Sequence, residues 1–284
     1  MTATNITAIR LRRLSASALR HGVLIAFTAL ALVPIYFMVV SSLKTPDEFI
    51  VNPFGPPHAP VLDTLAQSIA GGELYRWVGN SLIVTVGSVI LSTALAALAA
   101  YPISLMKWRP GAPILGILIA LMVMPPIILV IPLFQIVSGL HQLNTYQAVI
   151  AIYVGLLLPF STFLLASFFV TIPPSLMEAA RMDGAGSWRI FWAIVLPLSG
   201  PALATVVTVQ ALWVWNELLI AIVFLQDDSL RTLMVGLTVF NSRYRIDVPV
   251  VMAGMLWATL PMLLLYLAGQ RFFIRGLTAG GVKG

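Results

Sequence analysis

The residues of this chain that could do chemistry gather in one polar segment, residues 178–197, between two long apolar runs. Charged residues make up only 9% of the chain, yet this segment contains Glu178, Arg181, Asp183 and Arg189. Charged side chains of both signs can form strong hydrogen bonds with another protein. We therefore predict that this segment contacts a partner in the aqueous phase.

Residues for catalysis are scarce in the rest of the chain. There is no Gly-x-x-x-x-Gly-Lys-Ser/Thr loop to cradle nucleotide phosphates, so any use of ATP would need a partner. The histidines, His21, His58 and His141, lie far apart, and the absence of cysteine excludes disulfides, thiolate metal sites and thiol catalysis. We expect no enzyme activity, no metal and no cofactor in this chain.

The composition indicates what kind of protein must position the polar segment. Hydrophobic residues make up 60% of the chain and the mean hydropathy is +0.98. Its uncharged runs each exceed the roughly 20 apolar residues that cross a bilayer, and the longest, 110–177, breaks at 139–144. We predict an all-α polytopic membrane protein with six transmembrane helices, near residues 21–42, 80–106, 113–137, 146–170, 201–225 and 250–272.

Basic residues determine the expected orientation. With the N-terminus inside, eleven of the sixteen Lys and Arg residues lie in cytoplasmic segments. The positive-inside rule then places both termini in the cytoplasm. The net charge of +6 thus mostly reflects the membrane topology. The basic residues are scattered over both membrane faces, which argues against nucleic-acid binding. The apolar run 21–43 is too long for a typical signal core, so we expect a retained first span.

The chain is expected to form one membrane domain with short ends. We expect a cytoplasmic N-terminal segment, a six-span domain and a cytoplasmic tail, at residues 1–20, 21–272 and 273–284. The proline-rich residues 44–79 suit an irregular outer loop, and the outer residues 226–249 suit a short interfacial helix over 230–240.

Local signals predict a helix–glycine–helix shape for residues 174–200. Pro174 can open a short helix, and Gly184 can end it in the left-handed conformation. In that helix Glu178 and Arg181 are near enough to pair. Leu176, Ala179 and Ala180 would share a low face that another protein could approach closely.

A second helix is expected to follow the glycine. Ser187 is placed to cap its N-terminus and Pro197 to end it, before Pro201 opens the fifth span. An apolar stripe at helical spacing is expected to face the membrane interface, at Trp188, Phe191, Trp192 and Val195. On spacing alone, a passive elbow on the inner leaflet and a docking element fit equally well.

The segment resembles the cytoplasmic signature of binding-protein-dependent ABC importer permeases, carbohydrate-uptake branch, of the maltose-permease G-subunit type. The resemblance rests on Glu178-Ala179-Ala180, on Asp183-Gly184-Ala185, and on Ile194-Val195-Leu196-Pro197. It extends to Ser42-Leu43-Lys44-Thr45-Pro46, Asn80-Ser81-Leu82, Trp215-Asn216-Glu217 and the tail Gly276-Leu-Thr-Ala-Gly280 with Val282-Lys283-Gly284.

The resemblance implies that Glu178, Ala179, Ala180 and Gly184 dock on a cytosolic ATPase subunit, with Arg181 and Asp183 in the same helix. It implies as partners a homologous second permease, two copies of the ATPase and an extracytoplasmic solute-binding protein. The tail residues Arg275, Lys283 and Gly284 could also reach the ATPase, or could serve only as positive-inside anchors.

The solute path is expected where polar residues lie within the spans, because such groups usually face a bundle interior or a water-filled cavity. Asn216 and Glu217, between Trp213 and Trp215, could form a sugar-binding wall or could simply join helices. Tyr153 is a further candidate, for which core packing is the alternative. Three readings stay open: an importer permease for a sugar or another polar solute such as a phosphorylated polyol, an ion-coupled secondary transporter, and a scaffold subunit.

Overall fold

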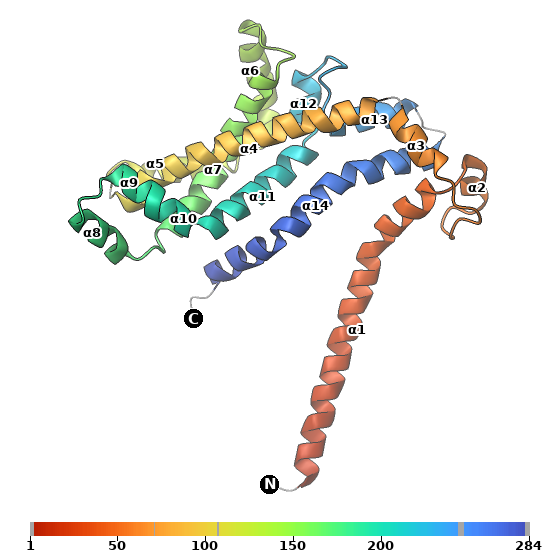
Figure 1. Cartoon of the computed structure of the whole chain (residues 1–284), viewed down its shortest axis with the longest axis horizontal. Coiled ribbons are helices and arrows are strands. Elements are labelled where there is room, and N and C mark those ends of the chain that lie inside the picture. Colours follow the sequence, from red (N-terminus) through yellow and green to blue (C-terminus); the bar gives the residue numbers. More distant parts are fainter. Residues whose placement is uncertain (1–2, 71, 107, 244–246, 282–284) are drawn as a thin grey trace. The chain divides into compact units, whose positions relative to one another are not determined.

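The computed structural model describes residues 3–70, 72–106, 108–243 and 247–281. Side chains are described for residues 17–66, 68–70, 72–106, 108–238, 247–267 and 270. The described residues form helices and no strand, in agreement with the predicted all-α class (Figure 1). The elements are α1 (Ala3–Ser42), α2 (Pro46–Val51), α3 (Asp63–Ala70), α4 (Glu73–Leu105), α5 (Gly111–Leu121), α6 (Pro126–Gly139), α7 (Tyr146–Phe169), α8 (Pro174–Met182), α9 (Ser187–Ile190), η1 (Phe191–Val195), α10 (Leu196–Leu198), α11 (Gly200–Asn216), α12 (Leu219–Phe224), α13 (Leu233–Arg243) and α14 (Val248–Gly281).

The chain divides into two compact units. The first contains Met1–Ala70 and Arg243–Trp257, and the second contains Gly71–Ser242 and Ala258–Gly284. Helix α14 therefore begins in the first unit and continues into the second. The predicted polar segment and the predicted path residues all belong to the second unit.

In the first unit, α1 contains an apolar stretch, Ser17–Ser42, that is long enough to cross a membrane. Lys44 follows it and is fully buried, a costly place for a charge. Its ammonium group donates hydrogen bonds to the carbonyl oxygens of Asn52 at 2.5 Å and Pro53 at 3.3 Å. Lys44 thus ties the following loop to the end of α1.

The expectation of an irregular loop over residues 44–79 was wrong, because α2, α3 and the start of α4 lie within it. The start of α2 carries ordinary helix signals. Thr45 Oγ1 accepts a hydrogen bond from the Glu48 amide at 3.3 Å, and Pro46 occupies the first helical turn. The expected short helix over 230–240 is present, three residues later, as α13.

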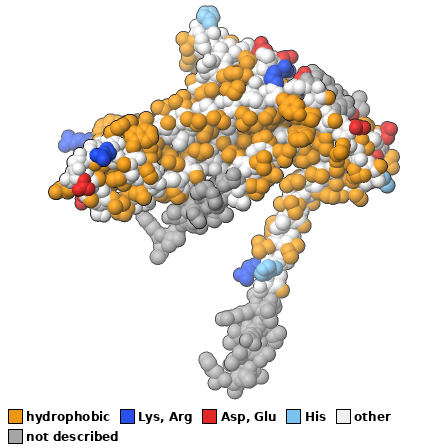
Figure 2. Space-filling view, viewed as in Figure 1, with side chains coloured by type: hydrophobic (Ala, Val, Ile, Leu, Met, Phe, Trp, Pro, Cys, Tyr) orange, Lys and Arg blue, Asp and Glu red, His pale blue; other side chains and the backbone are white. Residues whose placement is uncertain are grey.

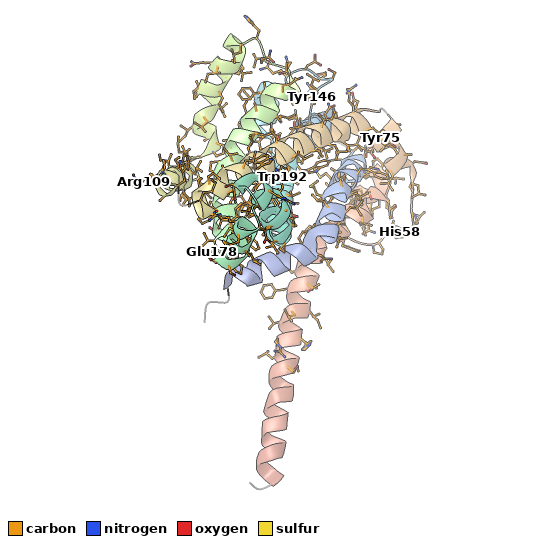
Figure 3. The ribbon with its side chains drawn as sticks, turned by 60° about the vertical axis from the view of Figure 1, so that its left-hand side comes forward. His58, Tyr75, Arg109, Tyr146, Glu178 and Trp192 are labelled. Carbon is orange, nitrogen blue, oxygen red and sulfur yellow. The ribbon has the colours of Figure 1, made fainter. Side chains whose placement is uncertain are left out.

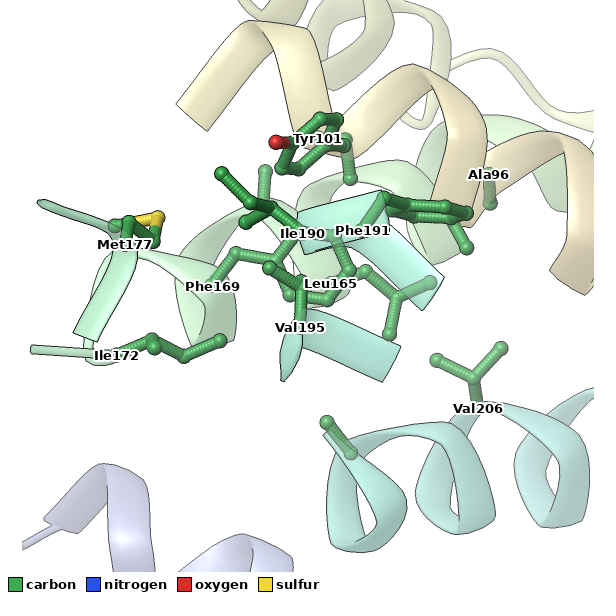
Figure 4. Packing of buried hydrophobic residues seen from close by; sticks show 14 residues of the cluster. Ala96, Tyr101, Leu165, Phe169, Ile172, Met177, Ile190, Phe191, Val195 and Val206 are labelled. Atoms are coloured by element: carbon green, nitrogen blue, oxygen red, sulfur yellow. The ribbon is translucent and has the colours of Figure 1, made fainter. Parts of the chain in front are cut away.

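The core of the second unit lies where α4, α7 and α11 pack together. Small residues allow the close approach of α4, since Ala96, Ala97 and Ala100 are at most 3% exposed. One cluster of buried side chains joins these alanines to Leu165 and Phe169 of α7 (Figure 4). A second cluster lies further along the same helices, around Val84, Val149 and Val214.

In the part of the chain that the structure describes, four helical stretches are long and apolar enough to cross a membrane singly, in α1, α4, α7 and α14. Large apolar side chains on α4 stay exposed, among them Ile83, Val86 and Ile90. On the face shown in Figure 2, hydrophobic side chains cover the long helices and the charged ones gather toward their ends. This distribution fits helices that are surrounded by lipid.

Two expected spans are not continuous helices. Residues 113–137 are divided between α5 and α6, which meet at 100°, because Pro125 and Pro126 interrupt the hydrogen-bond ladder. Pro132 lies inside α6 without ending it. Residues 201–225 are divided between α11 and α12 at Glu217. Within the described residues there are up to six candidate spans if each bent pair, α5–α6 and α9–α11, counts as one.

Candidate functional site

The polar segment begins with α8, a nine-residue helix whose ends are defined by its sequence. Pro174 is its first residue, as predicted. At its other end Gly184 has φ of 79°, in the left-handed region expected of a terminating glycine. The Gly184 amide donates to Arg181 O at 3.0 Å and the Ala185 amide to Ala180 O at 2.9 Å. These two bonds form a Schellman motif, which gives a rigid helix end.

The charged residues of α8 face outward. Glu178, Arg181 and Asp183 are exposed, and Glu178 lies at the edge of the molecule in Figure 3. The two described side chains Glu178 and Arg181 form no ion pair with each other, so the predicted pairing is absent. Both charges are therefore available to a partner.

The apolar face of α8 differs from the expected one. Met177 is the residue that packs into the core, and Ala180 lies half-buried against the same cluster. Ala179 is exposed beside Glu178, and Leu176 is also exposed. The low surface thus consists of Ala179 and the outer side of Ala180, next to the exposed charges.

The second half of the segment was predicted less accurately. Gly186, rather than Ser187, is the N-cap residue of α9. The expected stripe does not face one environment: Phe191 and Val195 are buried in the core, whereas Trp188 is 64% and Trp192 is 54% exposed. The stripe is wider than the surface that packs against α4 and α7. Only Phe191 and Val195 therefore reach those helices, and the two tryptophans stay outside.

The end of this half also differs. Residues Phe191–Val195 form a π-helical turn, η1, and α10 continues past Pro197 to Leu198. Pro197 therefore does not end the helix; the chain bends by 73° between the stretch Ser187–Leu198 and α11. Pro201 lies in the first turn of α11, as predicted. We call the whole segment Pro174–Leu198, from α8 to α10, the elbow.

The predicted path residues meet at the break between α11 and α12. Both carboxylate oxygens of Glu217 accept hydrogen bonds from the first amides of α12, including Leu219 at 2.8 Å and Ile220 at 3.0 Å. The Tyr153 hydroxyl of α7 donates to Glu217 Oε2 at 2.6 Å. Glu217 therefore caps α12 and joins it to α7, so its charge is compensated within the fold.

Aromatic rings lie beside this carboxylate. The rings of Trp213 and Tyr153 make an edge-to-face contact with centroids 5.9 Å apart. Trp213, Asn216 and Glu217 line one open depression of about 730 Å³. Trp213 also lines a neighbouring cavity of about 650 Å³ between the α5–α6 bend, α7 and α11. Trp215 and Tyr153 are both buried and line neither of these two hollows. The contacts of Tyr153 with Glu217 and Trp213 bring it to the cluster all the same.

A buried polar node was missed by sequence reasoning. Gln210 of α11 is fully buried, and its amide nitrogen donates to Ser92 Oγ of α4 at 3.0 Å and to Ser161 Oγ of α7. Its oxygen accepts from Thr93 Oγ1 at 3.2 Å. The node joins the three central helices, and Gln210 also lines the 650 Å³ cavity. The sequence signal that could have found this node is Gln210 itself, a polar side chain within a long apolar run.

A second missed group fixes the loop between α12 and α13. Asn80 of α4 donates to the carbonyl oxygens of Ser229 at 2.9 Å and Arg231 at 2.8 Å, and accepts from the Tyr146 hydroxyl at 2.7 Å. Asn144 Oδ1 accepts from the amides of Gln226 and Asp227. The loop is thus attached to α4 and to the turn that precedes α7.

No group of three or more His, Asp or Glu residues within the described part of the chain could hold a metal ion. The remaining predicted contacts of the tail, at Arg275, Lys283 and Gly284, lie outside the described side chains. The site therefore consists of the elbow and of the cluster at the α11–α12 break.

Comparison with solved structures defines the class of fold. A chain of a bacterial ABC transporter involved in the import of the acidic polysaccharide alginate matches with a TM-score of 0.79 and 24% identity, over 91% of this chain and 97% of that chain. The same kind of transporter in complex with an alginate pentasaccharide-bound periplasmic protein gives a TM-score of 0.67 at 14% identity, over 93% of this chain and 96% of that chain. The fold is that of an ABC importer permease.

Sequence comparison then defines the family. The family model described as "Binding-protein-dependent transport system inner membrane component" matches residues 83–274, more than half of the chain. The melibiose/raffinose/stachyose import permease protein MelC of Bacillus subtilis is 34% identical over 253 residues, 89% of this chain and 91% of the relative. The arabinooligosaccharides transport system permease protein AraQ of Halalkalibacterium halodurans is 32% identical over 265 residues, 91% of this chain and 94% of the relative. The chain belongs to this family of ABC transporter permeases.

Proposed function

We propose that this permease forms the membrane path for a sugar or oligosaccharide that an extracytoplasmic binding protein delivers, and that a separate subunit hydrolyses the ATP. The observation that supports this proposal most is the structure of the elbow, in a chain that belongs to the binding-protein-dependent family. Its charged helix is exposed, ends rigidly at Gly184 and is backed by buried residues of α4 and α7. The names of relatives such as MelC and AraQ support a carbohydrate as the solute.

The coupling role belongs to Glu178, Ala179, Ala180, Arg181, Asp183 and Gly184. A partner ATPase would contact the exposed charges and approach the backbone closely at Ala179. Motion of that partner would then push a short helix that has a fixed end and a buried anchor, Met177. This arrangement favours a docking element over a passive elbow on the membrane surface.

The solute path belongs to Tyr153, Trp213, Asn216 and Glu217. The partly exposed ring of Trp213 offers a face on which a sugar could stack, and Asn216 offers an amide to hydroxyl groups. Both hollows have mostly apolar linings, but they differ in their polar side chains. The 650 Å³ cavity is lined by Gln210, whose amide is already hydrogen-bonded to α4 and α7, whereas the depression is lined by Asn216 and Glu217. We therefore place sugar contacts at the open depression beside Trp213 rather than in that cavity. Trp215 is not part of this proposal because it is buried and lines neither hollow. Tyr153 is also buried and lines neither hollow, but its hydrogen bond to Glu217 and its ring contact with Trp213 make it part of the proposed wall.

The proposed partners follow from the family to which the chain belongs. They are a homologous permease, two copies of a cytosolic ATPase and the solute-binding protein, in the inner membrane of a prokaryote. With both termini cytoplasmic, the elbow faces the ATPase. The loop that Asn80 holds then faces the binding protein on the opposite side. The chain itself catalyses no reaction in this proposal.

Uptake by the reconstituted transporter tests the proposal. Proteoliposomes that contain this chain and its cognate subunits should accumulate the sugar only with ATP inside and binding protein outside. A thermal-shift screen of the binding protein against sugars and phosphorylated polyols identifies the solute to use. Accumulation that persists without ATP, or that follows an ion gradient, would contradict an ATP-driven importer.

A further inference from the structure

Tyr101 joins α4 to the elbow in two ways. Its hydroxyl donates a hydrogen bond of 3.0 Å to the carbonyl oxygen of Ser187, the first residue of α9. Its ring contacts the ring of Phe191, with centroids 5.2 Å apart. Both rings are buried, and Figure 4 shows Tyr101 above Ile190 and Phe191 in the core cluster. Tyr101 therefore contacts the elbow at its middle, between α8 and η1.

The hydrogen bond gives this junction a direction that apolar packing lacks. Apolar contacts of Ile190 and Phe191 favour close packing but do not fix one donor against one acceptor, because they are not directional. A buried hydroxyl must keep its partner, since an unsatisfied polar group in the core is costly. Among the described side chains, Tyr101 supplies the one hydrogen bond between α4 and the elbow.

The elbow departs from α-helical geometry on both sides of this junction. Before it, residues 183–186 form a turn that the Gly184 and Ala185 amides close onto α8; after it, the helix itself changes its geometry. Phe191–Val195 form a π-turn, and the chain bends by 73° before α11. A π-turn inside a helix often lies at a functional site. Displacement of the elbow can thus be absorbed between Phe191 and Ser199 and need not be absorbed between the elbow and α4.

We propose that Tyr101 is a positioning residue that makes α8, α9 and the end of α4 move as one body during the transport cycle. This inference rests on the proposed coupling role of α8. When the ATPase displaces α8, the Tyr101–Ser187 bond transmits the movement to α4, whose other end holds Asn80. Movement relative to α11 occurs at η1.

The hydroxyl variant Tyr101→Phe tests the directional bond, because it leaves the ring and its contact with Phe191. One neutral hydrogen bond corresponds to about a two- to tenfold change in an equilibrium. We expect transport per ATP hydrolysed to fall about two- to tenfold, while the amount of copurified ATPase stays unchanged. The matched control is Tyr75→Phe, an exposed tyrosine near the other end of α4. Transport per ATP equal to that of the control would overturn the inference, and so would loss of the ATPase.

The rigid-body claim has a test that does not depend on activity. The chain has no cysteine, so spin labels can be attached at cysteines introduced at Ser175 of α8 and Leu98 of α4, both exposed. In the assembled transporter the distance between the labels should be the same with and without ATP. In Tyr101→Phe it should broaden or shift when ATP binds. A distance that already changes in the unsubstituted complex would overturn the inference.

Failure of the inference and failure of the proposed function are distinguishable. If substitutions at Glu178 leave ATPase copurification and transport intact, the coupling role of α8 itself is wrong. If those substitutions uncouple transport but Tyr101→Phe behaves as Tyr75→Phe does, only the role of Tyr101 is wrong.

Discussion

The hydroxyl of Tyr153 donates a 2.6 Å hydrogen bond to Glu217, the residue at which the chain breaks between α11 and α12. The same carboxylate accepts hydrogen bonds from the first amides of α12. A single acidic residue thus terminates one helix, starts the next and attaches both to α7. Trp213 and Asn216 lie in the last turn of α11, which ends at Glu217, and all three residues line the open depression.

Removing the Tyr153 hydroxyl should destabilise this junction. Tyr153→Phe loses one hydrogen bond to a charged group, a loss of about 1.5–3 kcal/mol. We expect a lower thermal unfolding midpoint of the detergent-solubilised protein. Tyr36→Phe is the comparison, since that exposed hydroxyl donates a longer hydrogen bond, of 3.2 Å, to the uncharged Phe54 carbonyl oxygen. Equal midpoints for both variants would contradict the role given to Tyr153.

Loss of the Glu217 carboxylate should lower the thermal stability more than loss of the Tyr153 hydroxyl. Glu217→Ala removes the cap of α12 together with the bond from Tyr153, and a lost cap alone costs about 0.5–2 kcal/mol. Glu217→Gln keeps one oxygen and should be milder. We expect the thermal unfolding midpoint to be lowest for Glu217→Ala, higher for Glu217→Gln and highest for the unsubstituted protein. A Gln variant less stable than the Ala variant would show that the capping account is wrong.

The Gln210 node should stabilise the packing of the three central helices. Gln210→Met keeps the side-chain length but removes its hydrogen bonds to α4 and α7. Hydrogen bonds between membrane helices average about 0.6 kcal/mol each, so the node should contribute about 1–2 kcal/mol. The measurement is the unfolding free energy in detergent. A variant as stable as the unsubstituted protein would mean that the serines find equally good partners within their own helices.

Much of this fold could be predicted from the sequence, because the signals involved are local. Pro174 and Gly184 define α8 by the backbone conformations they allow, and the long apolar runs define the spans. The 100° bend after α5 lies at Pro125 and Pro126, which lack amide donors, but its angle depends on packing. The break at Glu217 carries no proline or glycine signal. It arises from a side chain that caps the next helix, which is a tertiary arrangement.

The candidate site was predictable only in part for the same reason. Periodicity indicated an apolar stripe after Ser187 but could not show that Phe191 and Val195 face protein while Trp188 and Trp192 stay exposed. Gln210, Ser92 and Ser161 are separated by many residues, so no spacing rule connects them. Such long-range pairs become visible only when the helices are placed.

The loop between α12 and α13 should loosen when Asn80 is changed. Asn80→Ala removes two hydrogen bonds donated to the loop backbone and the one accepted from Tyr146. We expect faster hydrogen exchange over residues 226–232 with little change in α11. Gln147→Ala, an exposed residue on α7, is the control. Unchanged exchange in this loop would show that Asn80 is not its anchor.

The central claim is that α8 docks on an ATPase, and Gly184→Ala tests it most directly. At φ of 79° an alanine is strained by about 1–2 kcal/mol, although open space surrounds the position. Gly184→Asn should be milder because asparagine tolerates this conformation, and Gly116→Ala inside α5 is the control, with the same open space and no positive φ. The measurement is the ATPase that copurifies with equal amounts of folded, membrane-inserted permease, followed by ATP-driven uptake. The account predicts a loss of both for Gly184→Ala, a smaller loss for Gly184→Asn and none for the control. Full ATPase binding and full uptake by Gly184→Ala would contradict it, as would loss of insertion or of the fold.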